Sequence, residues 1–215
     1  MAPKAVLFDF DGVLVDSENH HIAAWQRVFT VLGWYVPEPA AARAGVLDDR
    51  TFAEEIFTEW GAPLHDLDGW IARKQAIATM LLRDAPRLYP GTRELITRLS
   101  GRVRLAVVTT TWRENVEAAL GAIGLLDAFE TIVAKEDVEH GKPDPEPYQT
   151  ALKRLKLRTS AVALEDSPGG LASASGAGLR AVAVGHRLPP GDWTGESPYL
   201  AGFEPIEPVL ELLGF

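Results

Sequence analysis

The sequence predicts an α/β fold in which a Rossmann-like parallel sheet core carries an inserted α-helical cap domain. Short, continuously apolar runs recur along the chain, as is typical of strands covered on both faces of a parallel sheet. Segments with the periodicity of one-sided helices lie between these runs, which favours right-handed crossovers between parallel strands. One long stretch near the N-terminus has helical segments without a convincing strand, which indicates an insertion into the core.

Five apolar runs predict the strands of the core, at residues 5–8, 103–108, 131–134, 161–164 and 181–184. Helical periodicity predicts the helices between them, at residues 91–100, 112–121 and 144–156. The segment from 186 to 208 is rich in proline and glycine, so we expect it to be irregular surface chain.

The insertion lies between the first strand and the rest of the α/β pattern. It is predicted to hold about four helical segments, near residues 17–32, 38–44, 49–59 and 66–83. We therefore expect a core made of residues 1–15 and 85–215, and a helical cap made of residues 16–84.

The composition is that of a globular protein with an acidic surface. The 215 residues are 47% hydrophobic, and 21 basic against 30 acidic residues give a formal net charge of −9. Such a surface repels nucleic acid and anionic membranes, and the densest basic stretch, residues 153–158, suits the solvated end of a helix. The sequence has no signal-peptide pattern and no apolar run of about 20 residues, so we expect a cytoplasmic monomer without nucleic-acid or membrane partners. The absence of cysteine excludes disulfides, thiolate metal sites and cysteine catalysis.

Two carboxylates follow the first predicted strand. Ligands of open parallel sheets bind at the carboxyl ends of the strands, so polar residues at these ends are candidate site residues. Asp9 and Asp11, two residues apart, can face the same side, and Gly12 lets the chain turn sharply after them. One carboxylate could attack phosphorus while the other handles the proton. The alternative is a strand-to-loop junction in which aspartate caps a turn.

Hydroxyl groups and a second pair of carboxylates follow two other predicted strands. The hydroxyls of Thr109 and Thr110 could donate to a phosphoryl oxygen, although threonine is common in strands for its shape alone. Glu165 and Asp166 suit a hard cation such as Mg²⁺, or else form an exposed turn before a helix that Ser167 caps. Between these strand ends, Lys142 stands between glycine and proline, either as a positioned charge near anions or as a surface lysine.

In their order and spacing, these motifs resemble those of the haloacid dehalogenase superfamily. An Asp-x-Asp-Gly motif, a threonine after a strand, a lysine before proline and a late acidic pair occur in that order over nearly the whole chain. The phrases FDFDGVL, GKPDP and LEDS are similar to those of its β-phosphoglucomutase and phosphoglycolate phosphatase subgroup, and the helical insertion lies where that subgroup carries its cap.

The resemblance implies a role for each motif. Asp9 would attack the phosphoryl group, and Asp11 would protonate the leaving oxygen and then deprotonate the hydrolytic water. Mg²⁺ would be bound by the side chains of Asp9 and Asp166 and the backbone carbonyl of Asp11, with Glu165 assisting directly or through water.

The phosphoryl group itself would be held by Thr109 and Lys142, with Thr110 beside them. Dehalogenating members lack the second aspartate of the first motif, so the presence of Asp11 argues against dehalogenation.

The cap contains the residues expected to select the substrate. His21 and Trp25 are four residues apart and match a His and a Trp of the mutases, where the His faces the active site. Alternatively, Trp25 packs in the core of the cap and His21 is partly buried. The mutases also have an arginine that grips a second phosphate, close to where this chain has Asp48. A carboxylate would repel that phosphate, although Arg50 or Arg43 could reach it.

These features favour a Mg²⁺-dependent phosphatase acting on a small phosphorylated metabolite, such as a sugar phosphate or a compound like phosphoglycolate. The alternatives are a sugar phosphomutase and a non-catalytic phosphate-binding protein, and the intact Asp9 and Asp11 argue against the second. Arg113, after the threonine motif, either contacts the substrate or caps the next helix.

Overall fold

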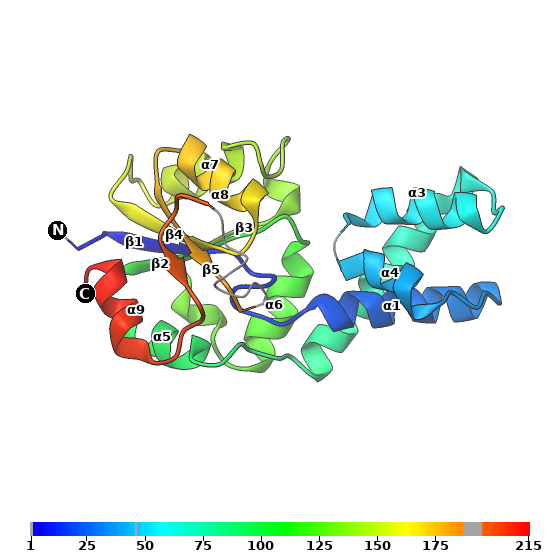
Figure 1. Cartoon of the computed structure of the whole chain (residues 1–215), viewed down its shortest axis with the longest axis horizontal. Coiled ribbons are helices and arrows are strands. Elements are labelled where there is room, and N and C mark those ends of the chain that lie inside the picture. The colour runs from blue at the N-terminus through cyan, green and yellow to red at the C-terminus, as the bar shows by residue number, and fades with distance from the viewer. Residues whose placement is uncertain (1, 46, 187–194) are drawn as a thin grey trace. The chain divides into compact units, whose positions relative to one another are not determined.

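The computed structural model describes residues 2–45, 47–186 and 195–215. They divide into two compact units, the core unit up to Asp16 and from Arg87 onward, and the cap unit Ser17–Pro86 (Figure 1). The predicted α/β fold with a helical insertion is confirmed. In the described part of the chain, no helix is both long and apolar enough to cross a membrane.

A six-stranded parallel sheet forms the centre of the core unit, with the strand order β3-β2-β1-β4-β5-β6. β1 lies in the middle and is completely buried, which explains why its sequence is continuously apolar. The strands are β1 Ala5–Phe8, β2 Arg104–Val108, β3 Thr131–Val133, β4 Ala161–Glu165, β5 Arg180–Val184 and β6 Tyr199–Leu200.

Helices cover both faces of this sheet, as Figure 1 shows. Helices α7 and α8 pack on one face, and α5, α6 and α9 lie on the other. The helices of the core unit are α5 Thr92–Leu99, α6 Arg113–Ala122, α7 Glu146–Arg154, α8 Pro168–Gly176 and α9 Ile206–Leu213, with short 3-10 turns η3 Leu126–Ala128 and η4 Lys135–Asp137.

The cap unit is helical and has its own aromatic core. The ring of Trp25 lies 5.8 Å from that of Phe29 and 5.3 Å from that of Phe52, and all three side chains are buried. The elements of this unit are α1 Glu18–Leu32, α2 Glu38–Ala42, η1 Arg43–Gly45, α3 Asp49–Glu59, η2 Leu64–Asp66 and α4 Leu67–Asp84.

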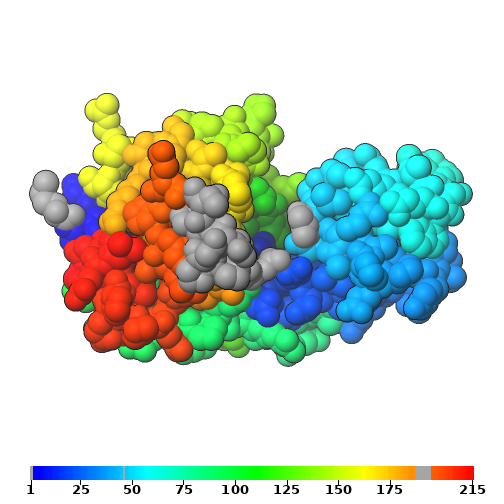
Figure 2. All heavy atoms as spheres, in the orientation of Figure 1, coloured from blue at the N-terminus to red at the C-terminus, as the bar shows by residue number. Residues whose placement is uncertain are grey.

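The prediction that residues 186–208 are irregular is wrong in two places. Tyr199–Leu200 pairs with Ala183 and Val184 of β5 and forms a short edge strand. Two residues are too few to show the periodic pattern by which a strand is predicted from sequence. Ile206 begins α9, whose apolar residues recur at helical spacing and whose helix ends with Gly214 in the left-handed region. Helix α9 lies on the outer surface of the core unit (Figure 2, red). Residues 187–194 of the predicted segment lie outside the described residues.

Candidate active site

The register of the sheet brings the predicted strand ends together. Phe8, the last residue of β1, pairs with Val107 of β2 and with Leu164 of β4. Asp9 therefore emerges between the end of β2 and the carboxylates that follow Leu164. The backbone N–H of Asp9 donates to the Leu164 carbonyl at 2.9 Å, which extends this parallel pairing by one bond. Ligands of such sheets bind at this edge.

Lys142 is the cation that the structure places against these carboxylates. Its Nζ donates to Oδ1 of Asp9 at 2.7 Å and to the carbonyl of Val108 at 2.8 Å, and it forms an ion pair with Glu165. The lysine side chain is 7% exposed, so the alternative of a surface lysine is wrong. Burial alone would lower the pKa of Lys142, but the carboxylates of Asp9 and Glu165 raise that pKa above its ordinary value.

Glu165 is completely buried, and both of its carboxylate oxygens are engaged. Oε1 accepts a hydrogen bond from the Tyr148 hydroxyl at 2.7 Å, and Oε2 accepts from Ser167 Oγ at 3.4 Å. Gly170 leaves space for this carboxylate, because a Cβ atom there would overlap Oε2. The buried environment, with burial as the main cause, raises the pKa of Tyr148 above its ordinary value, so its hydroxyl keeps its proton.

Tyr148 is a site residue that sequence reasoning missed. It lies on α7 beside the buried residues Ala151 and Leu152, so the sequence pattern identifies it only as part of an apolar helix face. The sequence feature that could have identified Tyr148 is its hydroxyl on an apolar helix face, because a buried hydroxyl needs a hydrogen-bond partner.

Three carboxylates are arranged so that they could hold a metal ion. Ligand oxygens of Asp9, Glu165 and Asp166 lie within 4.8 Å of one another. Burial raises the pKa of Asp9, the negative charge of Glu165 raises it further, and Lys142 offsets only part of this effect. A divalent cation would remove the remaining repulsion, and carboxylate oxygens are the ligands that Mg²⁺ prefers. The donor set therefore fits a hard cation such as Mg²⁺.

Gly12 provides the space in which Asp166 lies. A Cβ atom at Gly12 would overlap Oδ2 of Asp166, and the φ of Gly12 is +79°, which side chains other than glycine rarely adopt. Asp11 is half-buried and forms a parallel bridge with Val15 in the turn that follows β1.

The hydroxyl of Thr109 is oriented by the backbone. Thr109 is 1% exposed, and its Oγ1 accepts a hydrogen bond from the N–H of Thr111 at 3.1 Å. Because this oxygen accepts from within the turn, its own proton is left to be donated elsewhere. Thr111 is in turn bound by Asn115 of α6, at 3.2 Å, whereas Thr110 is exposed.

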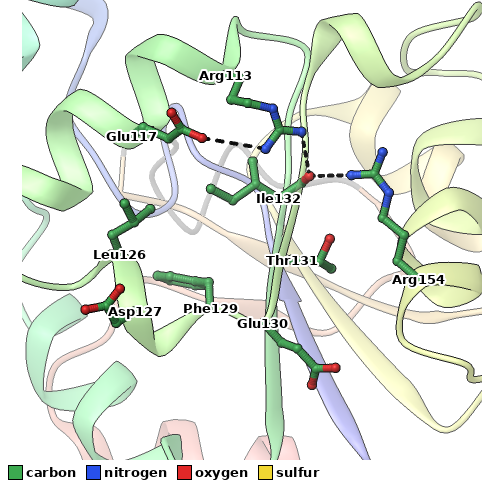
Figure 3. A pocket seen from close by; sticks show the side chains of 9 residues that line it. All are labelled: Arg113, Glu117, Leu126, Asp127, Phe129, Glu130, Thr131, Ile132 and Arg154. Atoms are coloured by element: carbon green, nitrogen blue, oxygen red, sulfur yellow. Dashed lines mark hydrogen bonds and ion pairs between the residues drawn. The ribbon is translucent and has the colours of Figure 1, made fainter.

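Arg113 lies over the outer edge of the sheet. Its guanidinium and that of Arg154 both donate to the carbonyl of Ile132, at 3.0 and 2.7 Å (Figure 3). Both arginines also pair with Asp137, and together they line a surface pocket of about 470 Å³ along β3. These contacts protect the unpaired edge of β3 and do not include the Asp9 cluster, so they do not favour the predicted contact of Arg113 with substrate.

The cap residues form a polar network of their own. Trp25 is completely buried and its indole N–H donates to Oδ1 of Asp49 at 2.9 Å, so Trp25 packs in the core of the cap, as its alternative interpretation states. Lys74 is 1% exposed and pairs with Asp49 at 2.6 Å. Nδ1 of His21 lies 2.8 Å from Nζ of Lys74, which makes His21 part of this network.

The arginines proposed for a second phosphate are already paired within the cap. Asp48 caps α3 by accepting from the backbone N–H groups of Arg50 and Thr51. The guanidinium of Arg50 pairs with the carboxylate of Asp68. The guanidinium of Arg43 pairs with the carboxylates of Glu55 and Glu59, the latter at 2.8 Å.

Substitution of Gly12 with alanine is expected to weaken Mg²⁺ binding by about 10- to 100-fold, because the new methyl group displaces Asp166. Isothermal titration with Mg²⁺ measures this effect. Gly101→Ala is the matched control, because Gly101 has a φ of +75° and open space around it. Both variants lose about 1–2 kcal/mol of stability from backbone strain. Equal Mg²⁺ affinities in the two variants would contradict the account of Gly12.

The stabilisation of the protein by Mg²⁺ is expected to depend on pH through Asp9. Because the pKa of Asp9 is raised above its ordinary value of 3.8, its carboxyl stabilises the metal-free fold at low pH, and this contribution is lost as the pH rises through the raised pKa. Mg²⁺ binds the ionised form, so its stabilisation should be full above that pKa, about 2.7 kcal/mol at a hundredfold excess over Kd, and should fall below it. Thermal unfolding across pH, with and without Mg²⁺, measures this. A Mg²⁺-induced shift of the unfolding temperature that is independent of pH, or unchanged in Asp9→Asn, would refute the assignment of Asp9 as a Mg²⁺ ligand.

The chain matches a known protein family, several relatives and several solved structures. The family described as haloacid dehalogenase-like hydrolase matches residues 6–184. The validoxylamine A 7'-phosphate phosphatase of Streptomyces hygroscopicus subsp. limoneus is 34% identical over 84% of this chain and 85% of its own length. The phosphorylated carbohydrates phosphatase of Thermotoga maritima is 30% identical over 98% of each chain.

Solved structures agree with these matches. CbbY from Rhodobacter sphaeroides in complex with phosphate superimposes with a TM-score of 0.82 and 30% identity, over 95% of this chain and 96% of that one. A second crystal structure of CbbY, in complex with xylulose-(1,5)bisphosphate, gives a TM-score of 0.83 at 28% identity. The chain therefore belongs to the haloacid dehalogenase-like hydrolase family and is one of its phosphatases with a helical cap.

Proposed function

We propose that the chain is a Mg²⁺-dependent phosphatase that hydrolyses a small, singly phosphorylated sugar or a phosphoglycolate-like metabolite through an aspartyl phosphate on Asp9. The observation that carries this proposal is the hydrogen bond between Lys142 and Asp9 inside a buried group of carboxylates at the ends of β1 and β4. A nucleophilic carboxylate needs nearby positive charge to approach a phosphate dianion, and this arrangement supplies it.

The reaction divides into two steps at Asp9. In the first, a carboxylate oxygen of Asp9 bonds to phosphorus, the ester P–O bond breaks, and Asp11 gives a proton to the departing alkoxide. In the second, Asp11 takes a proton from a water molecule that attacks the phosphorus, the bond to Asp9 breaks, and inorganic phosphate leaves. Asp9 and Asp11 thereby return to their starting states.

The remaining residues orient the phosphoryl group. Thr109, whose Oγ1 already accepts from Thr111, donates its proton to one phosphoryl oxygen, and Lys142 binds another. Thr110, exposed beside Thr109, is available to a third oxygen.

The metal would be held by the side chains of Asp9 and Asp166 and by the backbone carbonyl of Asp11. Glu165, which pairs with Lys142, would add a further negative charge near the metal ion. When bound, Mg²⁺ neutralises the charge that develops on the phosphoryl oxygens.

The substrate class rests on the relatives and on the charges of the cap. Two relatives carry names of phosphatases for phosphorylated compounds, one of them for carbohydrates. CbbY binds a bisphosphate, but in this chain Arg50 and Arg43 are paired with carboxylates of the cap, and Asp48 adds a negative charge beside the backbone of Arg50. A second phosphate would have to displace these partners, so a substrate with one phosphate is favoured. His21, bound to Lys74, is the cap group proposed to contact the sugar.

Phosphate release from a panel of metabolites tests the proposal. The purified protein is incubated with Mg²⁺ and glucose 1- and 6-phosphates, phosphoglycolate, glycerol phosphate and nucleoside monophosphates. We expect release from a sugar phosphate or from phosphoglycolate that stops with a chelator and falls by several orders of magnitude in Asp9→Asn, because the nucleophile is lost. Asp127→Asn, at an exposed carboxyl of the same unit, is the matched control and should keep full activity.

Two results would overturn the proposal. Hydrolysis that persists in Asp9→Asn would exclude the aspartyl phosphate. Isomerisation of β-glucose 1-phosphate with a bisphosphate activator, and no net phosphate release, would identify a mutase instead.

A further inference from the structure

Lys142 lies on an irregular loop, residues 138–145, that joins η4 to α7. Its side chain nevertheless reaches the buried carboxylates, with Nζ 2.7 Å from Oδ1 of Asp9. The backbone of an irregular loop has no regular ladder of hydrogen bonds, so its N–H and C=O groups need other partners. The position of the ammonium therefore depends on the bonds that hold this loop.

The carboxylate of Glu146, the first residue of α7, supplies two of these bonds. Oε1 accepts from the backbone N–H of Glu139 at 2.9 Å, and Oε2 accepts from that of His140 at 2.8 Å. Nδ1 of His140 lies 3.1 Å from the same Oε2. Both backbone groups come shortly before Lys142, so the side chain of Glu146 ties the entry of the loop to the start of α7.

The backbone of Glu146 binds the exit of the loop. The N–H of Glu146 donates to Oδ1 of Asp144 at 2.8 Å, and the N–H of Asp144 donates to the carbonyl of Gly141 at 3.0 Å. Ser173 of α8, which is completely buried, donates its hydroxyl to the Asp144 carbonyl. Hydrogen bonds therefore hold the loop on both sides of Lys142, and Glu146 takes part on each side.

An acidic residue in the first turn of a helix often stabilises only that helix. Such a side chain lies near the unpaired N–H groups of its own helix and interacts favourably with the helix dipole. The oxygens of Glu146 instead accept from Glu139 and His140, which precede α7. These two N–H groups lower the pKa of Glu146 below its ordinary value, so the carboxylate is charged at neutral pH and accepts with both oxygens.

We propose that Glu146 is a positioning residue that fixes the loop of Lys142, through the backbone N–H groups of Glu139 and His140, so that the ammonium stays in place for the phosphoryl group. This inference rests on the proposed function for the role of Lys142. The effect of Glu146 on the reaction passes through the loop. A displacement of about 1 Å at a reacting centre can lower a rate by about 100-fold, so a small movement of this loop would matter.

Two matched substitutions separate this role from a simple loss of charge. Glu146→Gln keeps the size of the side chain, but its amide nitrogen cannot accept, so one N–H of the loop loses its acceptor. Glu139→Gln removes the same charge from an exposed side chain of the same loop and keeps the backbone N–H. We expect kcat/KM to fall by about tenfold or more in Glu146→Gln and by less than about twofold in the control. Equal effects in the two variants would overturn the proposal.

The chemical signature is a loss that does not depend on the leaving group. Under the proposed function, Lys142 binds the transferred phosphoryl group, which all substrates share. The loss in Glu146→Gln should therefore agree within about threefold between p-nitrophenyl phosphate, whose leaving group needs no proton, and the sugar phosphate that wild type hydrolyses fastest. A loss confined to the sugar phosphate would overturn the proposal.

The affinity for Mg²⁺ distinguishes a displaced lysine from a damaged site. Isothermal titration of Glu146→Gln with Mg²⁺ should give an affinity no weaker than that of wild type, because a lysine that moves away leaves the carboxylates more negative. General disruption of the strand ends would instead weaken Mg²⁺ binding. A weaker affinity in Glu146→Gln would therefore overturn the proposal.

Hydrogen–deuterium exchange tests the anchor without reference to activity. The amides of Glu139 and His140 should exchange faster in Glu146→Gln than in wild type or Glu139→Gln. Unchanged exchange would overturn the proposal even if the enzyme is an active phosphatase. If wild type released no phosphate from either compound, the proposed function would fail, and the anchoring of the loop by Glu146 would still be decided by these exchange rates.

Discussion

The structure depends on one buried ion pair, between Lys142 and Asp9, at the carboxyl edge of the sheet. The parallel register of β1 and β4 places Asp9 beside the end of β4, so this register alone brings Glu165 and Asp166 close to Asp9. Buried like charges destabilise a fold, and one lysine cannot balance three carboxylates. This excess of negative charge is what allows the site to hold a divalent cation, and it links the sheet topology directly to the proposed chemistry.

Many neighbouring residues serve to keep these charges in place. Tyr148 donates to Oε1 of Glu165, the same oxygen that pairs with Lys142, and glycine at positions 12 and 170 leaves room for the carboxylates of Asp166 and Glu165. Each contact fixes a charged group that would otherwise move away from its like-charged neighbours. Functional sites commonly retain such locally unfavourable arrangements because the surrounding fold stabilises them. In this chain the stabilising elements are β1, β4 and helices α7 and α8, and all of them belong to the core unit.

Much of the fold was predictable from the sequence, because buried parallel strands require continuous apolar runs, and the runs at β1, β2 and β4 are followed by polar residues. Asp9 and Lys142 were identifiable because Asp9 follows a strand, Lys142 lies between glycine and proline, and both occur in the order of the four motifs. The strand β6 was missed since two residues carry no periodicity, and α9 was missed because the proline-rich segment before it masked its start. The hydrogen bond between Tyr148 and Glu165 joins segments distant in sequence, and a local pattern gives no sign of such a pair. Arg113 shows another limit, since its place after the threonine motif suggested either a substrate contact or a helix cap, and neither pattern indicated that its side chain would bind the carbonyl of Ile132 at the edge of β3.

The central claim is that Asp9 accepts a phosphoryl group between Lys142 and a cation held by the carboxylates. A crystal structure of the protein with Mg²⁺ and beryllium trifluoride, a stable mimic of a phosphoryl group, tests it most directly. The account predicts beryllium trifluoride bonded to a carboxylate oxygen of Asp9, with Lys142 and Thr109 donating to its fluorine atoms and Mg²⁺ bound by Asp9 and Asp166. Beryllium trifluoride on another residue, or Mg²⁺ bound away from these carboxylates, would contradict the account.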